Sequence, residues 1–505
     1  MTRNTMLFSL LMAIEGIGVA ATLSVAPGQQ YSTPCAAINA AKDGDTIEIQ
    51  GGFTYVGDTC VVARNNLTIR GVNGRPKIDA AGKNAKDKGT WVVDGNNITV
   101  ENVEMYGSRV SDGNGAAFRL EGNGFTLRNS FIHDNQNGIL ANPMPNSDVL
   151  IEYSEFGHNG NGDGQTHNLY IGHVKSLTFR YSYSHDANVG HNLKSRAEVN
   201  TVVYSRFGSL NNGETGSTAQ GKPSYELDFP NAGETYVIGN VIQQPYYSSN
   251  PAILAYGEEG ATNASQQLYV VNNTFINDAG DGPFLFLSGK VNTPSLVQNN
   301  IFTGQGQVST RTDTIFKTNY RSGISAVVSR EGGDFHPLAS GTVINAGSNP
   351  GVSATGVSLV PVGQYRNTAQ GEARPVSGAL DVGAYEATGD VAVASAPTWT
   401  QCAAENGKCT FSGSREVRFG AADQYTSKMF TGSVTCNAAS FGIDPAKGIV
   451  KNCDLAGSTP TPAPVPAPSN PTPVPTPAPV TLDAAALAAK LNAAFGDILN
   501  ISVKK

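Results

Sequence analysis

Two segments of the sequence, 24 residues apart, repeat the same order of polar and apolar residues. The first is His167-Asn-Leu-Tyr-Ile171 and the second is His191-Asn-Leu-Lys-Ser195, and Tyr225-Glu-Leu-Asp-Phe229 follows the same pattern later in the chain. Side chains alternate between the two faces of a strand, so inward-facing leucines would turn their neighbours outward. The repeat therefore predicts two exposed columns: Asn168, Asn192 and Glu226 in one, and Tyr170, Lys194 and Asp228 in the other.

The residues of the second column, together with Arg196, could perform β-elimination on a uronic acid. This reaction needs a cation at the carboxylate, a base for the C5 proton and an acid for the leaving oxygen. Arg196 would neutralise the carboxylate through its guanidinium fork. Lys194, with its pKa lowered by the nearby arginine, would be the base, and Tyr170 or His191 would donate the proton. The predicted substrate is an acidic polysaccharide.

Hard oxygen ligands beside this group predict a Ca²⁺ site at Glu226 and Asp228. The predicted substrate-binding residues are His167, Asn168, Asn192 and Arg206. The same alternation would turn His167 and His191 inward, where a buried, hydrogen-bonded role is an equal alternative.

Other functions remain open at this stage. Asp228 and Glu226 are two residues apart on one strand, about 6.5–7 Å, which suits the carboxylate pair of a glycoside hydrolase, with Asp186 or Glu214 as helpers. A uronate epimerase on the same scaffold is a related alternative. A third is a non-catalytic surface or adhesion protein, whose charged columns are only a solvated face.

Six of the seven histidines lie between His133 and His191. His133 lies six residues after the apolar residue Leu127, and His185 lies six residues after Phe179. His158 lies seven residues after Ile151. Such spacing predicts either a stacked ladder at a turn or a metal site.

A short pattern of alternating apolar residues ending in Asn or Tyr recurs along the chain. Its second apolar positions are 23 to 36 residues apart: Ile69, Val100, Leu127, Ile151, Phe179, Val202, Ile238, Val270 and Val297. Short strands at this irregular period predict a parallel β-helix of about nine or more coils, each burying its apolar side chains against its neighbours. The last position of the pattern predicts a structural ladder of Asn102, Asn129, Tyr153, Tyr181, Tyr204, Asn240, Asn272 and Asn299.

Residues 22–387 resemble the right-handed parallel β-helix proteins of the pectate-lyase-like superfamily. The resemblance lies in the opening segment Thr22–Gln50, in Gly190-His-Asn-Leu-Lys-Ser-Arg-Ala197 and in the closing Gly378-Ala-Leu-Asp-Val-Gly-Ala-Tyr-Glu386. It implies the fold, but this scaffold carries lyases, hydrolases, epimerases and non-catalytic proteins. Lyases of the fold commonly use Lys or Arg as base and often Ca²⁺, which Lys194 and Arg196 match only loosely.

Composition and the chain ends indicate an exported protein. The 505 residues carry 34 basic and 41 acidic side chains, and this acidic balance argues against a nucleic-acid partner. Residues 1–21 have the pattern of a signal peptide, and no later stretch is apolar enough to span a membrane. Six cysteines in two clusters predict one disulfide near the start and two near the end, with the pairing of the last four left open. We expect a secreted, periplasmic or surface-bound monomer.

The fold class predicted is all-β, a right-handed parallel β-helix with a small disulfide-stapled β module and a short C-terminal helix. The module covers residues 399–455, after a linker at 388–398, and its aromatic residues suit either sugar stacking or a core. A Pro- and Thr-rich spacer covers residues 456–481. In the tail, residues 482–505, apolar side chains four apart predict an amphipathic helix.

Overall fold

The computed structural model describes residues 20–209, 221–322, 327–329, 333–338, 342–387, 399–421 and 424–456. The predicted signal peptide up to residue 19, the linker 388–398, and the spacer and tail from residue 457 onward lie outside these residues. In the described parts of the chain, no helix has the length and apolar character needed to cross a bilayer.

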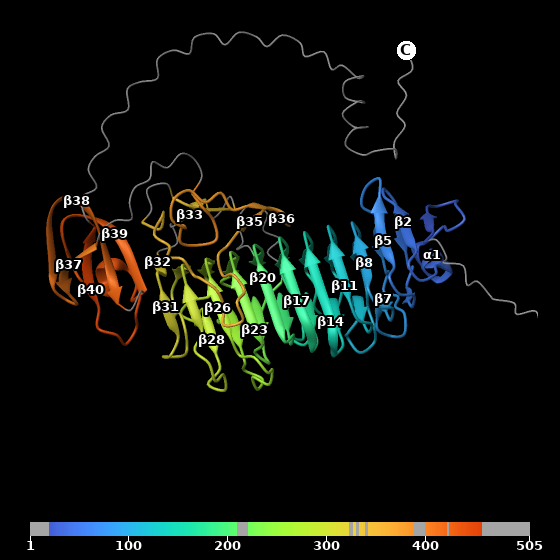
Figure 1. Cartoon of the computed structure of the whole chain (residues 1–505), viewed down its shortest axis with the longest axis horizontal. Coiled ribbons are helices and arrows are strands. Elements are labelled where there is room, and N and C mark those ends of the chain that lie inside the picture. The colour runs from blue at the N-terminus through green and yellow to red at the C-terminus, as the bar shows by residue number, and fades with distance from the viewer. Residues whose placement is uncertain are drawn as a thin grey trace, which may run out of the picture. The chain divides into compact units, whose positions relative to one another are not determined.

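Three long parallel sheets run along a stack of coils, and each full coil contributes one strand to each sheet in turn (Figure 1). Sheet A contains β1 (Thr22–Val25), β2 (Thr46–Gln50), β5 (Thr68–Val72), β8 (Ile98–Glu101), β11 (Phe125–Arg128), β14 (Met144–Glu152), β17 (Val174–Arg180), β20 (Val199–Val203), β23 (Glu234–Ile238), β26 (Leu268–Val271), β29 (Leu296–Gln298) and β31 (Ile315–Lys317). Sheet B contains β3 (Thr54–Val56), β6 (Lys77–Asp79), β9 (Glu104–Tyr106), β12 (Phe131–His133), β15 (Glu155–Gly157), β18 (Tyr183–His185), β21 (Arg206–Gly208), β24 (Val241–Gln244), β27 (Thr274–Asn277), β30 (Ile301–Gly304) and β32 (Tyr320–Ser322).

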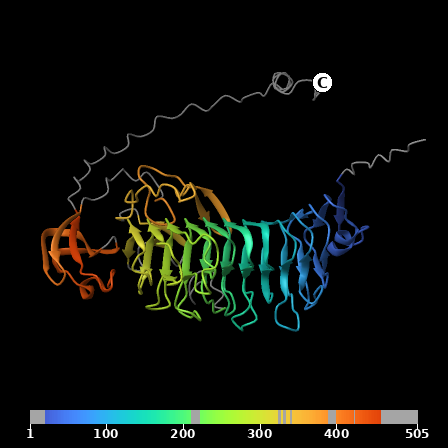
Figure 2. The ribbon, with the colours of Figure 1, turned by 60° about the horizontal axis from the view of Figure 1, so that its bottom comes forward.

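Sheet C carries Tyr170, Lys194 and Asp228 of the predicted site. Its strands are β4 (Cys60–Val62), β7 (Gly89–Val93), β10 (Ala116–Leu120), β13 (Asn137–Ala141), β16 (Leu169–Ile171), β19 (Leu193–Ser195), β22 (Leu227–Phe229), β25 (Leu254–Tyr256) and β28 (Leu285–Leu287). The turned view in Figure 2 shows the coils following one another along the axis. The predicted fold, a right-handed parallel β-helix, is confirmed for the described residues.

The core of the coil stack consists of apolar side chains that repeat at the same position of successive coils. Leu127 pairs with Ile151 and Ile151 with Phe179, and all three are fully buried. One predicted core position is wrong by one residue, because Val202 pairs with Val237 and not with Ile238. Stacking of identical positions buries apolar area that a single coil could not cover.

The Asn and Tyr ladder lies at the corner between sheets A and B, where each coil turns sharply. Its members adopt the left-handed conformation; Tyr181, for example, has φ 51° and stacks on Tyr153 and Tyr204 with ring centroids 5.2 and 5.5 Å apart. Asn240 is the exception, because Gly239 takes the corner in that coil at φ 70°. Asn240 instead accepts a hydrogen bond from the backbone N–H of Ser205. Its predicted ladder position is therefore wrong by one residue.

A later segment covers the outer face of sheet B. It contains β33 (Val327–Ser329), β34 (Asp334–Pro337), β35 (Gly363–Arg366) and β36 (Gln370–Ala373). Its Phe335, Tyr365 and Tyr385 form one apolar cluster with Tyr183 and Val241 of sheet B. The outer face of this part of sheet B is thereby buried, whereas no comparable cluster covers sheet C at β16–β22 among the described residues.

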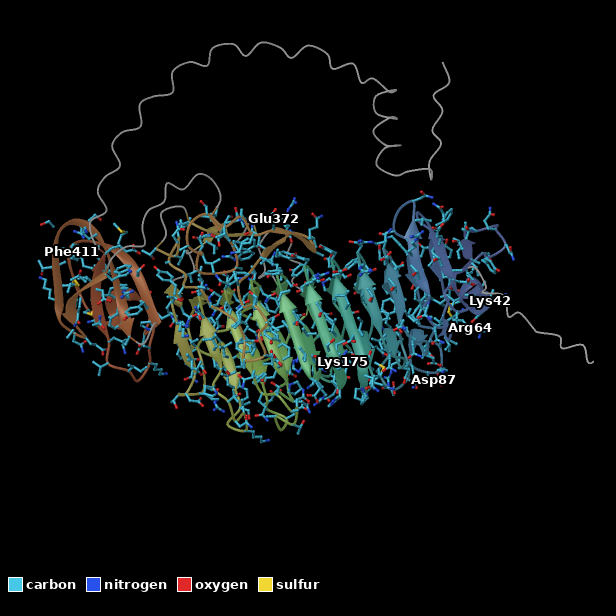
Figure 3. All side chains as sticks on the ribbon, in the orientation of Figure 1. Lys42, Arg64, Asp87, Lys175, Glu372 and Phe411 are labelled. Atoms are coloured by element: carbon cyan, nitrogen blue, oxygen red, sulfur yellow. A yellow bond between two sulfur atoms is a disulfide. The ribbon has the colours of Figure 1, made fainter. Side chains whose placement is uncertain are left out.

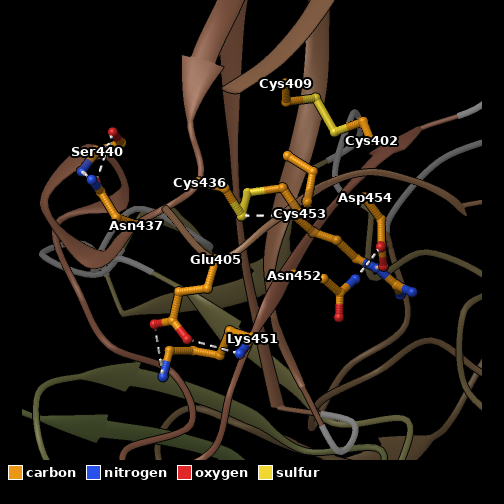
Figure 4. The surroundings of a disulfide bond; sticks show 12 residues. Cys402, Glu405, Cys409, Cys436, Asn437, Ser440, Lys451, Asn452, Cys453 and Asp454 are labelled. Carbon is orange, nitrogen blue, oxygen red and sulfur yellow. Dashed lines mark hydrogen bonds and ion pairs between the residues drawn. A yellow bond between two sulfur atoms is a disulfide. The ribbon is translucent and has the colours of Figure 1, made fainter. Parts of the chain in front are cut away.

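The N-terminal end of the stack carries the short helix α1 (Pro34–Ala40) and the disulfide Cys35–Cys60. At the other end the cysteine module forms antiparallel strands β37 (Trp399–Ala404), β38 (Lys408–Ala421), β39 (Gln424–Thr435) and β40 (Asn452–Ala456), with the short helix α2 (Ala438–Phe441). Its disulfides are Cys402–Cys409 and Cys436–Cys453 (Figure 4), which resolves the pairing that the sequence left open.

The module continues sheet B, because β39 pairs with β32 through Tyr320 opposite Tyr425. Its core contains Phe419 and Phe441, whose rings stack 5.3 Å apart. Phe411, labelled in Figure 3, is half-buried and packs against the same core. These three aromatic side chains therefore contribute to the core of the module.

Candidate functional site

The second predicted column lies on the outer face of sheet C. Tyr170 pairs with Lys194, and Lys194 with Asp228, so the three residues occupy one register position on β16, β19 and β22. The leucines that precede them are fully buried in the core. Strand alternation thus turns this column away from the core as predicted, but Lys194 and Asp228 are buried, so the prediction that they are exposed is wrong.

Two cations of this face share one carboxylate. Lys194 Nζ lies 2.6 Å from Oε1 of Glu259, and Arg196 NH2 lies 2.5 Å from Oε2 of the same side chain. The loop after β25 contributes Glu259. Arg196 also donates from Nε to the Tyr170 hydroxyl at 2.8 Å and from NH1 to Asn231. The result is a fork of two positive groups, each bound to one oxygen of one carboxylate.

Asp228 lies behind the fork, with its side chain almost fully buried. Its Oδ2 is 3.1 Å from Lys194 Nζ and 3.3 Å from His191 Nε2. Burial, and next the hydrogen bond and charge of Glu258, raise the pKa of Asp228 well above its ordinary value. Burial alone would lower the pKa of Lys194, but Asp228 and Glu259 outweigh burial and raise it. Lys194 is therefore an ammonium in the ligand-free protein, and the prediction that Arg196 lowers its pKa is wrong.

Three carboxylates at this point form a donor set that fits a hard cation. Oxygens of Asp228, Glu258 and Glu259 lie within 4.8 Å of one another. Ca²⁺ prefers oxygen ligands from carboxylates, so these three residues fit it. Lys194 supplies the positive charge among them, and any bound cation would compete with its ammonium.

The first predicted column is not exposed. Asn168, Asn192 and Glu226 are fully buried, so the prediction that they face the solvent is wrong. They form a hydrogen-bonded ladder inside the coils: Asn168 donates to Asn192 at 2.8 Å and Asn192 to Glu226 at 2.5 Å. Neither asparagine can touch a substrate on the outer face, and Glu226 cannot join Asp228 in a metal site there.

Burial raises the pKa of Glu226 well above its ordinary value of 4.5, and the nearby Asp186 raises it further, while His185 opposes this. A carboxyl with a raised folded-state pKa is most stabilising below its unfolded pKa and loses that contribution as the pH rises. We therefore expect Glu226→Gln to unfold at a higher temperature than the wild type at about pH 8, with the difference vanishing near pH 4. Thermal unfolding followed by circular dichroism at several pH values measures this, and a lower Tm of the variant at high pH would contradict it.

His167 and His191 stack with Tyr225 at the edge of sheet C. The rings of the two histidines lie 4.7 Å apart, and those of His191 and Tyr225 lie 5.1 Å apart. The backbone N–H groups of His191 and Tyr225 donate to Nδ1 of His167 and of His191, which leaves the proton of each neutral ring on Nε2. Burial lowers the pKa of His167 to about 3 and that of His191 well below its ordinary value. Both rings are thus neutral and held by the coil above.

Arg206 lies on sheet B and not beside the fork. Its guanidinium packs on the rings of Tyr183 and Phe335, at 5.1 and 4.8 Å, under the segment that covers sheet B. The side chain is buried, so the predicted contact of Arg206 with a substrate is wrong for this arrangement.

A second polar cluster follows the histidines of sheet B. His185 Nδ1 lies 2.8 Å from Asp186, His185 Nε2 lies 3.1 Å from Glu155, and His158 lies 3.5 Å from Asp186. Burial would lower the pKa of His185, but the two carboxylates outweigh it and raise it to about 9. His158, His185 and Asp186 are close enough to hold a metal ion, yet a charged His185 already satisfies both carboxylates. The predicted stacked ladder of His133, His158 and His185 is wrong: His133 and His185 are strand residues in register with Gly157, and the ring of His158, one residue further along, meets His185 edge-on.

The sequence interpretation missed Glu258, Glu259 and Asn231. All lie in loops just past strands of sheet C. Arg196, Asn231 and Glu259 follow the inward leucines Leu193, Leu227 and Leu254 by three, four and five residues. Extending the leucine ladder by one more coil to Leu254 would have placed Glu259 next to the fork.

Comparison with known proteins supports the fold. No protein-family model matches the chain. Among solved structures it is similar to pectate lyase Pel9A, with a TM-score of 0.51 and 16% identity over 74% of this chain and 98% of that one. A pectin methylesterase, PemA from Erwinia chrysanthemi, aligns with a TM-score of 0.31 and 12% identity over 62% of this chain and 91% of that one. The chain therefore has a right-handed parallel β-helix fold similar to that of pectate lyase Pel9A.

Proposed function

We propose that this protein is an extracellular enzyme that binds a uronic-acid-containing polysaccharide on the outer face of sheet C and cleaves it by β-elimination. The observation that carries the proposal is the fork of Lys194 and Arg196, which holds one carboxylate between two cations. A uronate presents the same group, and charge-assisted contacts of this kind are among the strongest that a polar ligand can make. Three disulfides fit an oxidising compartment.

In this proposal Arg196 binds the uronate carboxylate and stabilises the negative charge that develops on it. The Lys194 ammonium first loses a proton to solvent, and the resulting neutral amine then takes the C5 proton, so that the C4–C5 double bond forms as the C4–O bond breaks. Tyr170 then gives its proton to the leaving oxygen. Its hydroxyl oxygen accepts from Arg196, which leaves its hydrogen free to be donated. His191 is less suitable, because Nδ1 accepts from the backbone and Nε2 faces Asp228.

The proposal includes a Ca²⁺ site formed by Asp228, Glu258 and Glu259. Asp228 was predicted from the sequence, and Glu258 and Glu259 take the place of the other predicted ligand, Glu226. A bound cation would supply positive charge for a second uronate carboxylate or for the same one. The residues of this chain would hold it through carboxylate oxygens only.

Activity on defined polysaccharides tests the proposal. We expect the protein, incubated with pectate, alginate or a glycosaminoglycan, to generate the ultraviolet absorbance of an unsaturated uronate on one of them. The assay is run with added Ca²⁺ and with a chelator, and loss of the rate in chelator would assign the metal. Failure of every acidic polysaccharide to yield this absorbance would contradict elimination.

Hydrolysis is the second candidate, because burial and the hydrogen bond with Glu258 raise the pKa of Asp228, which favours its protonated form. A general acid needs such a proton. The burial of Asp228 favours elimination over hydrolysis, since an acid must reach the glycosidic oxygen. New reducing ends without absorbance would support hydrolysis, and binding without cleavage would support a non-catalytic carbohydrate-binding protein.

A further inference from the structure

The Glu259 side chain occupies the place that the proposed function gives to a substrate carboxylate. Each of its oxygens contacts one cation, Oε1 with Lys194 and Oε2 with Arg196. A single carboxylate that bridges two cations in this way satisfies both of them, so a uronate cannot enter the fork while Glu259 remains there.

The two cations do not depend on Glu259 for their positions. Arg196 is held independently by the Tyr170 hydroxyl and by Asn231. Lys194 is also contacted by the buried Asp228 side chain, whose Oδ2 lies 3.1 Å from its Nζ. The fork would therefore keep its geometry if the Glu259 side chain moved away, and preorganised groups of this kind bind a ligand without a further ordering cost.

The Glu259 side chain has room to leave without movement of its backbone. It is 42% exposed, whereas the Lys194 side chain is only 10% exposed. The Glu259 N–H donates to the Pro230 carbonyl at 3.1 Å, and the Gly257 N–H donates to the Phe229 carbonyl at 2.9 Å. These hydrogen bonds fix the loop to the neighbouring coil, so rotation of the side chain into solvent is the simplest way to open the fork.

We propose that Glu259 is an internal competitor of the substrate: its carboxylate fills the Lys194–Arg196 fork in the free protein and is displaced by a uronate carboxylate on binding. The inference rests on the proposed function and concerns the metal-free protein, in which the Glu259 carboxylate contacts Lys194 and Arg196. The affinity for an anionic sugar then depends on how well the sugar carboxylate competes with the Glu259 carboxylate for Lys194 and Arg196.

Calorimetric titration in the presence of a chelator tests this. The probes are purified oligogalacturonates and alginate oligosaccharides, with a methyl-esterified oligogalacturonate as the uncharged control. We expect Glu259→Gln to bind the charged oligosaccharide that the wild type recognises about tenfold more tightly, the order that two partly exposed ion pairs can contribute. Glu372→Gln, an exposed glutamate in β36 (Figure 3), is the matched control and should bind as the wild type does.

The outcomes separate the two proposals. Unchanged or weaker binding by Glu259→Gln in chelator would overturn the competitor role, and weaker binding restricted to calcium-containing buffer would assign Glu259 as a metal ligand instead. In both cases the wild type still binds a uronate, and the proposed function stands. If neither the wild type nor Glu259→Gln binds or cleaves any charged oligosaccharide, the proposed function fails and this inference with it.

Discussion

Replacing Lys194 with alanine is expected to lower the turnover number on the uronic-acid substrate by about 100- to 10,000-fold, the range that general bases contribute. Lys194 lies at the centre of the outer column, in register with Tyr170 and Asp228, and the proposal assigns it the C5 proton. The formation of the unsaturated uronate, followed by its absorbance at saturating substrate, measures the effect. Binding should weaken much less, since Arg196 remains.

Lys194→Arg separates the charge of this side chain from its basicity. Arginine keeps the positive charge but does not lose its proton in proteins, so the variant should bind substrate and still fail to turn it over. Lys175→Ala is the matched control, because Lys175 is an exposed lysine on β17 of sheet A that pairs with Asp148 (Figure 3). A Lys194→Ala enzyme within tenfold of the wild-type turnover number would remove Lys194 from the role of base.

Much of the fold follows from local sequence. Leu169, Leu193 and Leu227 occur at the same place in successive repeats, and each can be buried only by stacking on the others. The spacing of the leucines therefore predicts one coil per repeat. The alternation of side chains within a strand predicts that Tyr170, Lys194 and Asp228 point away from the core. These inferences need only nearest-neighbour geometry, which is why they hold.

The inner column was mispredicted because strand alternation was applied one residue too far. β16 begins at Leu169 and β19 begins at Leu193, so Asn168 and Asn192 lie in the preceding turns. There the chain bends, and the two asparagines point into the stack, where their amides satisfy one another. The repeat of residue types along the sequence does not show where this bend occurs.

The remaining errors and omissions come from long-range packing. Arg206 is covered by Phe335, a residue of a segment that returns over sheet B after the coils end. Glu259 reaches Lys194 from a loop 65 residues further along the chain. Neither contact leaves a periodic signal, so each depends on where a distant segment lies in three dimensions.

Asn168→Ala is expected to destabilise the coil stack by about 3–5 kcal/mol, because it leaves several buried polar groups without a partner. The Asn168 amide donates to Asn192 at 2.8 Å, to the His185 carbonyl at 2.7 Å and to the Ser184 hydroxyl at 3.1 Å. Its carbonyl accepts from Asn159 at 2.9 Å. Alanine supplies none of these groups, and the interior ladder is fully buried, so water cannot replace them without opening the coil.

The midpoint of guanidinium unfolding, with tryptophan and tyrosine fluorescence as the signal, measures this loss. Asn123→Ala is the matched control: Asn123 belongs to an exposed ladder at a turn, where its amide donates to Asn96 at 3.4 Å, and its loss should cost less than about 0.5 kcal/mol. The contrast between the two asparagines is the test, since both stack on the neighbouring coil and only one is buried. Equal effects would mean that burial of the ladder inside the coils adds nothing to stability.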